Sequence, residues 1–353
     1  MKRAFFVLII VISCLYGKLG YELLMEDSSL KSLPTGSLSD IAETVTAIPL
    51  QSTGKEKIGS VKSIQQESGN LFLISNDILY RFSRSGDFIC RITNPQTMRV
   101  AGYAVDPLNK RLIVLGNEAD IHYYSYTGEL LDAKKMDNND AFKQVRSIVV
   151  HNNYIWTTEE NVCFDPSTGQ LLMERTAVKY DPSFLKIESR TLSAADLTKK
   201  PLFPSFLGLE LAFTEATGQV YAYSPTVDPE SLLQDTLLLH RRQLPPCNPL
   251  CAEQITVYPL RFGQRYWLSS YKDPSKPSES CTFCFDRDSC KSWQIEGGFK
   301  DNFYHTGSIA QLQAMDVYSN SYYYCKYGKE LKQKFPGRTD TDAPVIFIVQ
   351  LKV

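Results

Sequence analysis

A carboxylate, an amide and an imidazole lie within five residues of one another in the segment GGFKDNFYHTG, as Asp301, Asn302 and His305. Side chains of these types can bind a metal ion, exchange protons or form hydrogen bonds to a ligand. Loops held on a rigid scaffold often carry binding residues. These three are therefore the candidate ligand-binding residues. The alternative, which the pattern favours, is that Asp301 and Asn302 satisfy the backbone of a turn.

The nine cysteines include two short spacings, Cys247-x3-Cys251 and Cys281-x2-Cys284. Four thiolates spaced in this way can bind zinc tetrahedrally. However, Cys284 precedes a Phe-Asp pair just as Cys163 does, so we expect both at equivalent positions of a repeated strand. Export to an oxidising compartment, argued below, also favours disulfides or free thiols. We therefore expect no metal and no other cofactor.

Catalytic chemistry has few further candidates. A histidine-rich metal site is not expected, because His122 stands among tyrosines in a strand-like stretch and His240 in the charged string HRRQ. A site built from Asp, Glu or Asn side chains stays open. No GxSxG, phosphate-loop or dinucleotide motif occurs in a strand-to-helix context. We therefore assign no catalytic residue.

The N-terminus has the pattern of an export signal. Lys2 and Arg3 precede an apolar run of nine residues, which is too short to span a bilayer. The run leads into VISC, which resembles a bacterial lipobox, so Cys14 is expected to carry lipid; the alternative is an ordinary signal peptide cleaved elsewhere. Residues 1–14 would be the signal peptide. Residues 15–42 would be a tether between the lipid anchor on the membrane and the folded part.

Strands must position these candidates, because the strongest pattern in the chain is a repeated phrase. It reads FSRSGDFI, YSYTGELL, FDPSTGQLL and, with cysteine in place of glycine, FDRDSCKSW. The first three glycines, Gly86, Gly128 and Gly169, are 42 and 41 residues apart. Each phrase is typical of a hairpin whose turn needs positive φ. A strand-bearing repeat of about 40 residues predicts a β-propeller with one four-stranded antiparallel blade per repeat.

The repeats can be followed along most of the chain. Blades are expected over residues 58–93, 99–136, 145–178, 202–246 and 255–295. The last repeat lacks a strand, and residues 43–50, ETVTAIPL, alternate as a strand should, so we expect them to pair with residues 343–352. The prediction is an all-β fold over residues 43–353, a six-bladed β-propeller closed by this N-terminal strand.

The charge pattern excludes one class of partner. The formal net charge is -1, with 38 basic and 39 acidic residues interspersed along the chain. A nucleic-acid-binding protein usually carries a basic patch or stripe. We therefore expect no nucleic-acid partner.

Several phrases together resemble a known family, the six-bladed propeller lipoproteins of the Bacteroidota, which are related to NHL-type and TolB-type propellers. They are the lipobox, AIPLQST followed by IGSVKSI, LYRFSRSGDFICRI, GGFKDN and the closing DAPVIFIVQLK. Members of the family usually carry a glycine-rich stretch after the first blade, where this chain has ITNPQTMRVAG. The resemblance implies an exported, lipid-anchored protein of the cell envelope, either periplasmic or on the outer-membrane surface. It implies little about activity.

Two functions of different classes are compatible with this sequence. The leading hypothesis is a non-catalytic binding or scaffold propeller for a protein, peptide or glycan ligand. The alternative is a metal-dependent hydrolase or lyase of the lactonase or amidating-lyase type, with its site in the central channel. Convergence of three or more Asp, Glu, Asn or His side chains on the axis would distinguish the second from the first.

Overall fold

Strands make up nearly all of the regular structure. The helices among the described residues are η1, a 3-10 turn (Leu38–Asp40), and α2 (Leu331–Lys334), and neither is long and apolar enough to cross a membrane. The computed structural model describes residues 31–32, 35–51, 57–117, 120–135, 144–151, 153–165, 170–196, 210–214, 219–223, 237–240, 256–257, 261–262, 265–272, 280–286, 288–289, 291–315, 320–329, 331–336 and 343–353.

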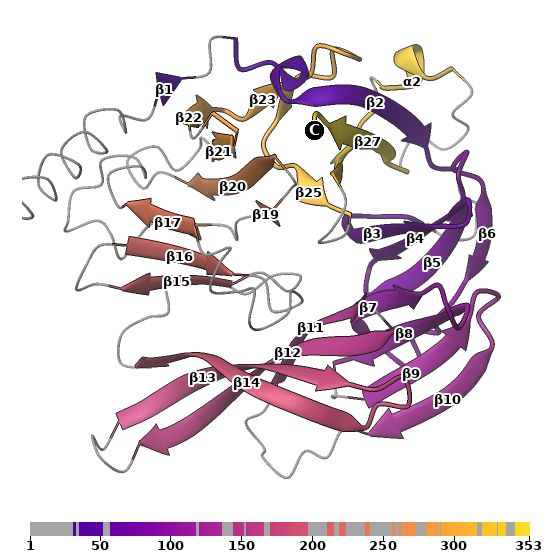
Figure 1. Cartoon of the computed structure of the whole chain (residues 1–353). Helices are drawn as coiled ribbons and strands as arrows, with labels where there is room; N and C mark the ends of the chain where they lie inside the picture. The colour runs from indigo at the N-terminus through magenta and orange to yellow at the C-terminus, as the bar shows by residue number, and fades with distance from the viewer. Residues whose placement is uncertain are drawn as a thin grey trace, which may run out of the picture.

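Antiparallel sheets lie around a common axis, each in the manner of one propeller blade (Figure 1). Two adjacent sheets agree with the predicted repeats. The first consists of β3 (Val61–Glu67), β4 (Asn70–Ser75), β5 (Ile78–Ser83) and β6 (Phe88–Arg91). The second consists of β7 (Val100–Asp106), β8 (Arg111–Gly116), β9 (Asp120–Ser125) and β10 (Leu130–Lys135). In both sheets the strand order follows the chain, so each is an up-and-down blade.

The remaining sheets continue around the axis. They are β11 (Gln144–His151), β12 (Tyr154–Asp165), β13 (Gln170–Tyr180) and β14 (Lys186–Asp196); β15 (Glu210–Thr214), β16 (Gln219–Tyr223) and β17 (Leu237–His240); and β18 (Thr256–Val257), β19 (Arg261–Phe262), β20 (Tyr266–Lys272), β21 (Ser280–Asp286) and β22 (Lys291–Glu296). Strands β3, β7 and β11 contact one another in turn and lie nearest the axis (Figure 1). The described sheets therefore form a β-propeller.

The third blade differs from its prediction. It was expected to end near residue 178, but its fourth strand, β14, extends to Asp196. In the first blade, the turn between β4 and β5 depends on Asn76 and Asp77, which adopt φ of 51° and 61°. The third repeat has Glu159 and Glu160 in that region, followed by Asn161, and Glu tolerates this left-handed conformation less well than Asn or Asp. The chain consequently stays extended through the twelve residues of β12.

This continuous strand shifts the glycine phrase within the third blade. FDPSTGQLL connects the second and third strands there, whereas FSRSGDFI connects the third and fourth strands of the first blade. Cys163 therefore lies in a second strand and Cys284 in a third strand. The expected equivalence of these two cysteines is wrong.

The two ends of the described chain meet in one sheet. Strand β2 (Ala42–Pro49) pairs antiparallel with β27 (Val345–Leu351), in the register Val45↔Val349, as residues 43–50 were expected to do. The sheet is completed by β26 (Ser321–Lys326) and β25 (Gln313–Ala314), in the order β2-β27-β26-β25. The outermost strand thus comes from the N-terminal side of the first blade. Pairing of β2 covers an edge that β27 would otherwise expose.

The folded part begins before residue 43. Leu38 and Ile41, which fall in the predicted tether, are 0% and 1% exposed. A further two-residue strand, β1 (Lys31–Ser32), pairs in parallel with β22 at the edge of its sheet. Residues 35–42 therefore belong to the folded part, and β1 adds a short strand before them.

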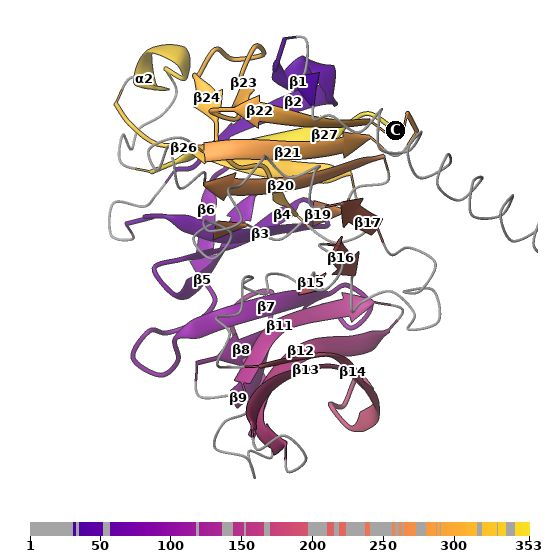
Figure 2. The same cartoon turned by 90° about the vertical axis from the view of Figure 1, so that its left-hand side faces the viewer.

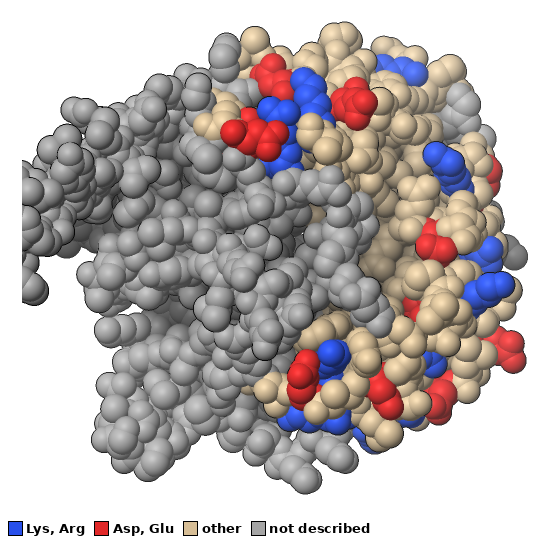
Figure 3. Space-filling view, in the orientation of Figure 1, with Lys and Arg blue, Asp and Glu red and all other residues tan. Residues whose placement is uncertain are grey.

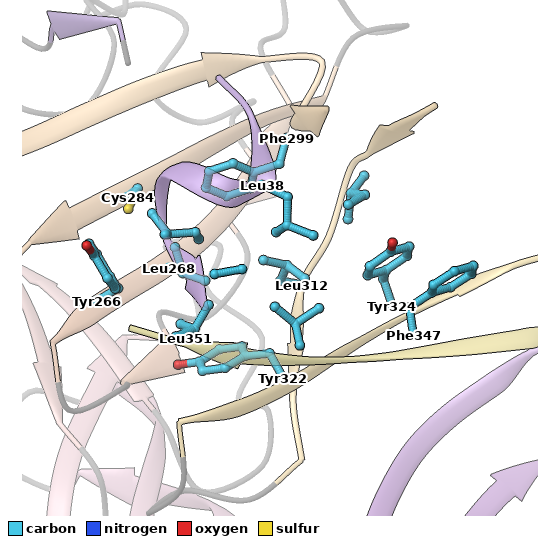
Figure 4. Close-up of a cluster of buried hydrophobic side chains, with 14 of the residues drawn as sticks. Leu38, Tyr266, Leu268, Cys284, Phe299, Leu312, Tyr322, Tyr324, Phe347 and Leu351 are labelled. Atoms are coloured by element: carbon cyan, nitrogen blue, oxygen red, sulfur yellow. The ribbon is translucent and has the colours of Figure 1, made fainter. Parts of the chain in front are cut away.

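A large apolar cluster joins this segment to the blades on both sides (Figure 4). Leu38 packs with Phe299 and Leu312, and the ring of Tyr324 stacks on that of Phe347 with centroids 4.6 Å apart. Full burial of each such side chain contributes about 1.5–3 kcal/mol.

On the described part of the face in Figure 3, acidic and basic side chains are interspersed.

Glycines of the repeated phrase also join neighbouring blades. Gly86 adopts φ of +94°, and a Cβ there would lie 2.3 Å from the carbonyl oxygen of Pro49 in β2. Gly128 adopts φ of +87°, with the carbonyl oxygen of Arg91 in β6 at 3.0 Å from such a Cβ. The residue must therefore be glycine for two reasons, the positive φ and the approach of the preceding blade's outermost strand.

Candidate functional site

Asp301 lies in the loop between the short strands β23 (Phe299–Lys300) and β24 (Ser308–Ile309), and it is 5% exposed. Its carboxylate accepts hydrogen bonds from the backbone N–H groups of Phe303, Tyr304 and Thr306 and from the Thr306 hydroxyl. Burial opposes ionisation of Asp301, but these hydrogen bonds outweigh it and hold the pKa below its usual value. Asp301 therefore organises the loop from within.

Asn302 and His305 make hydrogen bonds to other parts of the fold. The Asn302 amide accepts a hydrogen bond from Ser39 N–H at 3.1 Å and donates one to the Ser39 hydroxyl at 2.7 Å. It thereby fixes η1 to the loop. His305 is exposed and adopts φ of 54°, and its carbonyl accepts a hydrogen bond from Lys334 of α2. The three candidates share one loop, but the first two satisfy polar groups of the fold; ligand contact stays a prediction.

A cavity of about 310 Å³ opens beside this loop, between the β3–β6 sheet and the β2-β27-β26-β25 sheet. Ser60 and Val61 at the start of β3 contribute one wall. The rest comes from the segment that leads from β24 into β25 and from the end of β26: Ser308, Ile309, Ala310, Gln311, Gln313, Tyr323, Tyr324, Cys325, Lys326 and Tyr327. The cavity lies at the end of the propeller where the innermost strands β3 and β25 begin.

This end carries several blade-to-blade connections. The loop of residues 301–307 was expected on the same face as the connections around residues 95–97 and 138–140. Figure 2 shows the β23–β24 hairpin, α2 and the start of β7 towards one side of the molecule. This agrees with the expectation for the connection that leads into β7, around residues 95–97. Residues 138–140 lie outside the described residues. Connections of this kind commonly frame ligand sites on propellers and barrels.

Lys326 is the charged side chain of the cavity wall. Its ammonium group donates a hydrogen bond to the Ser308 carbonyl, which leaves two N–H donors without an acceptor among the described residues. Burial lowers the pKa of Lys326, and the charge of Asp301 partly offsets that effect. The described residues of the cavity wall include no carboxylate. The wall therefore carries one basic side chain, and that side chain is only partly hydrogen-bonded among the described residues.

Two amides and one aromatic ring complete the polar surface. Gln313 accepts a hydrogen bond from the Tyr323 hydroxyl at 2.5 Å, so its NH2 group can face the cavity. The Gln311 amide makes no hydrogen bond to any residue that the structure describes. Tyr327 is 42% exposed, and its hydroxyl accepts a hydrogen bond from Val61 N–H at 3.0 Å. The Tyr327 ring is thereby held at the rim of the cavity.

Two further candidates from the sequence, Cys284 and His122, lie within strands. Cys284 is buried beside Tyr266 and Leu268, and burial raises its pKa, so its thiol is protonated at neutral pH. Cys247 and Cys251, the other half of the zinc pattern, lie outside the described residues. His122 contacts Asp120 and Tyr124 within β9. No group of three or more His, Cys, Asp and Glu side chains that could hold a metal ion occurs among the described residues.

Sequence reasoning missed the cavity residues. Gln311, Lys326 and Tyr327 belong to no sequence motif, and the segment NSYYYCKYG, which contains the last two, predicts only a strand. The one available signal was a lysine directly after a run of buried aromatic residues, where a charge needs a partner or solvent. Burial also raises the pKa of Cys325, the thiol in the wall, to about 12, so it is no activated nucleophile at neutral pH.

Comparison with known proteins agrees with the fold. No known family and no curated protein matches the chain. A solved protein of Bacteroides fragilis, described as exported, superposes with a TM-score of 0.58 over 92% of this chain and 98% of its own, at 14% identity. The Cps50 (Swd1) β-propeller domain of Myceliophteria thermophila gives 0.42 over 87% and 100%, at 8% identity. The likeness to the Bacteroides fragilis protein, at 14% identity, concerns the fold alone.

Proposed function

We propose that this protein is a cell-envelope lipoprotein whose six-bladed, ring-closed propeller is a non-catalytic binding module. A rigid β-propeller with a cavity at the end where its innermost strands begin supports a role in binding. The similarity to an exported protein supports a location outside the cytoplasm. The export pattern at residues 1–14 supports attachment to a membrane through Cys14.

One observation carries the binding proposal. Lys326 and Gln311 leave polar groups unused in a wall that rigid strands hold in place. Buried polar groups of a folded protein are usually satisfied within it, whereas polar groups that line a cavity can bond to a ligand. The ligand is a protein, peptide or glycan segment that enters this cavity.

A cavity-filling variant tests this proposal. Ala310→Trp would place an indole in the cavity from an exposed alanine, and Ala133→Trp on the exposed strand β10 is the matched control. Thermal melts of the full chain would be recorded with a panel of neutral sugars, uronic acids and short peptides. We expect the panel members that raise the melting temperature of the wild type and of Ala133→Trp to have no effect on Ala310→Trp. Equal shifts in all three proteins would place binding elsewhere and refute the proposal.

A further inference from the structure

The geometry points to an acidic sugar, a uronic acid or a glycan that ends in one, as the ligand of the cavity between β3 and β26. This inference rests on the proposed binding function and adds the chemical class of the ligand. Three features of the wall carry it. They are the balance of hydrogen-bond donors, the position of Lys326 and the rim residue Tyr327.

The cavity offers more donors than acceptors. Lys326 has two N–H groups to spare, and the amides of Gln311 and Gln313 can each present an NH2 group. The described wall has no Asp or Glu side chain of its own; the carboxylate whose charge acts on Lys326 is that of Asp301 in the adjoining loop. A ligand that supplies several acceptors, one of them charged, satisfies this set best, and a carboxylate is such a group.

Asp301 does not compete for the remaining N–H groups of Lys326. It lies near enough to influence Lys326, yet no ion pair joins the two side chains among the described residues. Both carboxylate oxygens of Asp301 accept hydrogen bonds from the loop, two from backbone groups on Oδ1 and two from Thr306 on Oδ2. A ligand carboxylate on the cavity side of Lys326 would therefore meet an ammonium group that makes one hydrogen bond among the described residues.

Tyr327 favours a sugar over a peptide. Tyr327 is 42% exposed at the rim, and the hydrogen bond from Val61 to its hydroxyl holds it there. A fixed aromatic face can pack against the C–H face of a pyranose ring while neighbouring amides bond to its hydroxyl groups. The two amides of the wall, Gln311 and Gln313, can bond to such hydroxyl groups.

Calorimetric titration of the full chain with D-glucuronate and D-glucose tests the inference, because the two sugars differ in the carboxylate. We expect glucuronate to bind about ten- to a hundredfold more tightly, the usual range for one charge-assisted hydrogen bond. Lys326→Met keeps the aliphatic stem and should abolish the preference, and Lys326→Arg should retain it. Lys134→Met is the matched control, since Lys134 also donates to a backbone carbonyl, that of Ser183, away from the cavity.

Other results would overturn either the acidic-sugar inference or the proposed function, and the two cases can be distinguished. Equal affinities for the two sugars, or a preference that survives Lys326→Met, would overturn the acidic-sugar inference. So would N-acetyl-alanyl-alanine binding as tightly as glucuronate, because that ligand carries a carboxylate without a sugar ring. If these ligands still lose binding in Ala310→Trp, the proposed function stands and only the ligand class is wrong. If Ala310→Trp leaves the binding unchanged, the proposed function itself fails.

Discussion

The loop of residues 301–307 and the cavity wall beside it use polar residues in opposite ways. In the loop, the side chains of Asp301 and Asn302 accept hydrogen bonds from backbone N–H groups of the fold. Asn302 fixes the N-terminal segment through its bond with Ser39. In the wall, Gln311 and Lys326 keep groups that the described protein does not satisfy. The loop was conspicuous in the sequence and the wall was not. A cluster of polar residues in a turn is thus weaker evidence for a ligand than one lysine at the end of a buried strand.

Removal of the loop carboxylate should have the largest effect on stability. Asp301→Ala would leave buried N–H groups of the loop without an acceptor, so we expect a loss of about 3–5 kcal/mol in the free energy of unfolding. Urea denaturation followed by fluorescence would measure it. A loss below about 1 kcal/mol, combined with weaker glucuronate binding, would show that Asp301 belongs to the ligand site and would remove the contrast between loop and wall.

The glycines give a second comparison, this time between blades. Gly86→Ala would bring a Cβ within 2.3 Å of the Pro49 carbonyl oxygen, whereas a Cβ at Gly69 has no neighbour within 4 Å, although both residues have positive φ. We expect a loss of about 3 kcal/mol for Gly86→Ala and about 1 kcal/mol for Gly69→Ala. Similar melting temperatures for the two variants would mean that only the turn, and not the contact between blades, requires glycine.

The stability contributed by Asp301 should depend on pH in a definite direction. Its pKa is held below the unfolded value of about 3.9, so the unfolded state binds more protons as the pH falls between these two values. The stabilisation is therefore complete above about pH 5 and is lost as the pH falls through the folded pKa. Asp301→Asn removes this dependence, so the wild type and the variant should differ more at pH 7 than at pH 3. A constant difference across this range would contradict the assignment.

The predicted lipid attachment concerns the N-terminal segment and should not affect the folded part. Residues 35–42 belong to the fold, so a lipid on Cys14 would act through the chain before them. Cys14→Ser should release the protein from the membrane fraction without a change in its melting temperature. Continued membrane association, with no mass added by acyl chains, would refute lipidation.

Substitution in the wall should have the smallest effect on stability. Gln311→Ala removes an amide that bonds to no described residue, so the free energy of unfolding should change by less than about 0.5 kcal/mol. Binding of glucuronate should weaken severalfold in the same variant. A large loss of stability would show that Gln311 serves the fold, as Asp301 does.

The repeated glycine phrase predicted the propeller because it records a local requirement, a turn with positive φ, at a fixed period. It failed in the third blade, where Glu159 and Glu160 stand in the region of Asn76 and Asp77 and β12 stays extended. The cavity could not be predicted in this way. Val61 and Tyr327 are 266 residues apart and meet only because the last sheet lies beside the first. Nothing local in the sequence encodes that contact.

A crystal structure of the protein soaked with D-glucuronate would test the central claim most directly. The account predicts the sugar in the cavity between β3 and β26, with its carboxylate within hydrogen-bonding distance of Lys326 Nζ and its ring against Tyr327. The hydrogen bonds of Asp301 should remain unchanged. A sugar bound instead to Asp301, Asn302 and His305, with the loop opened to admit it, would contradict the account.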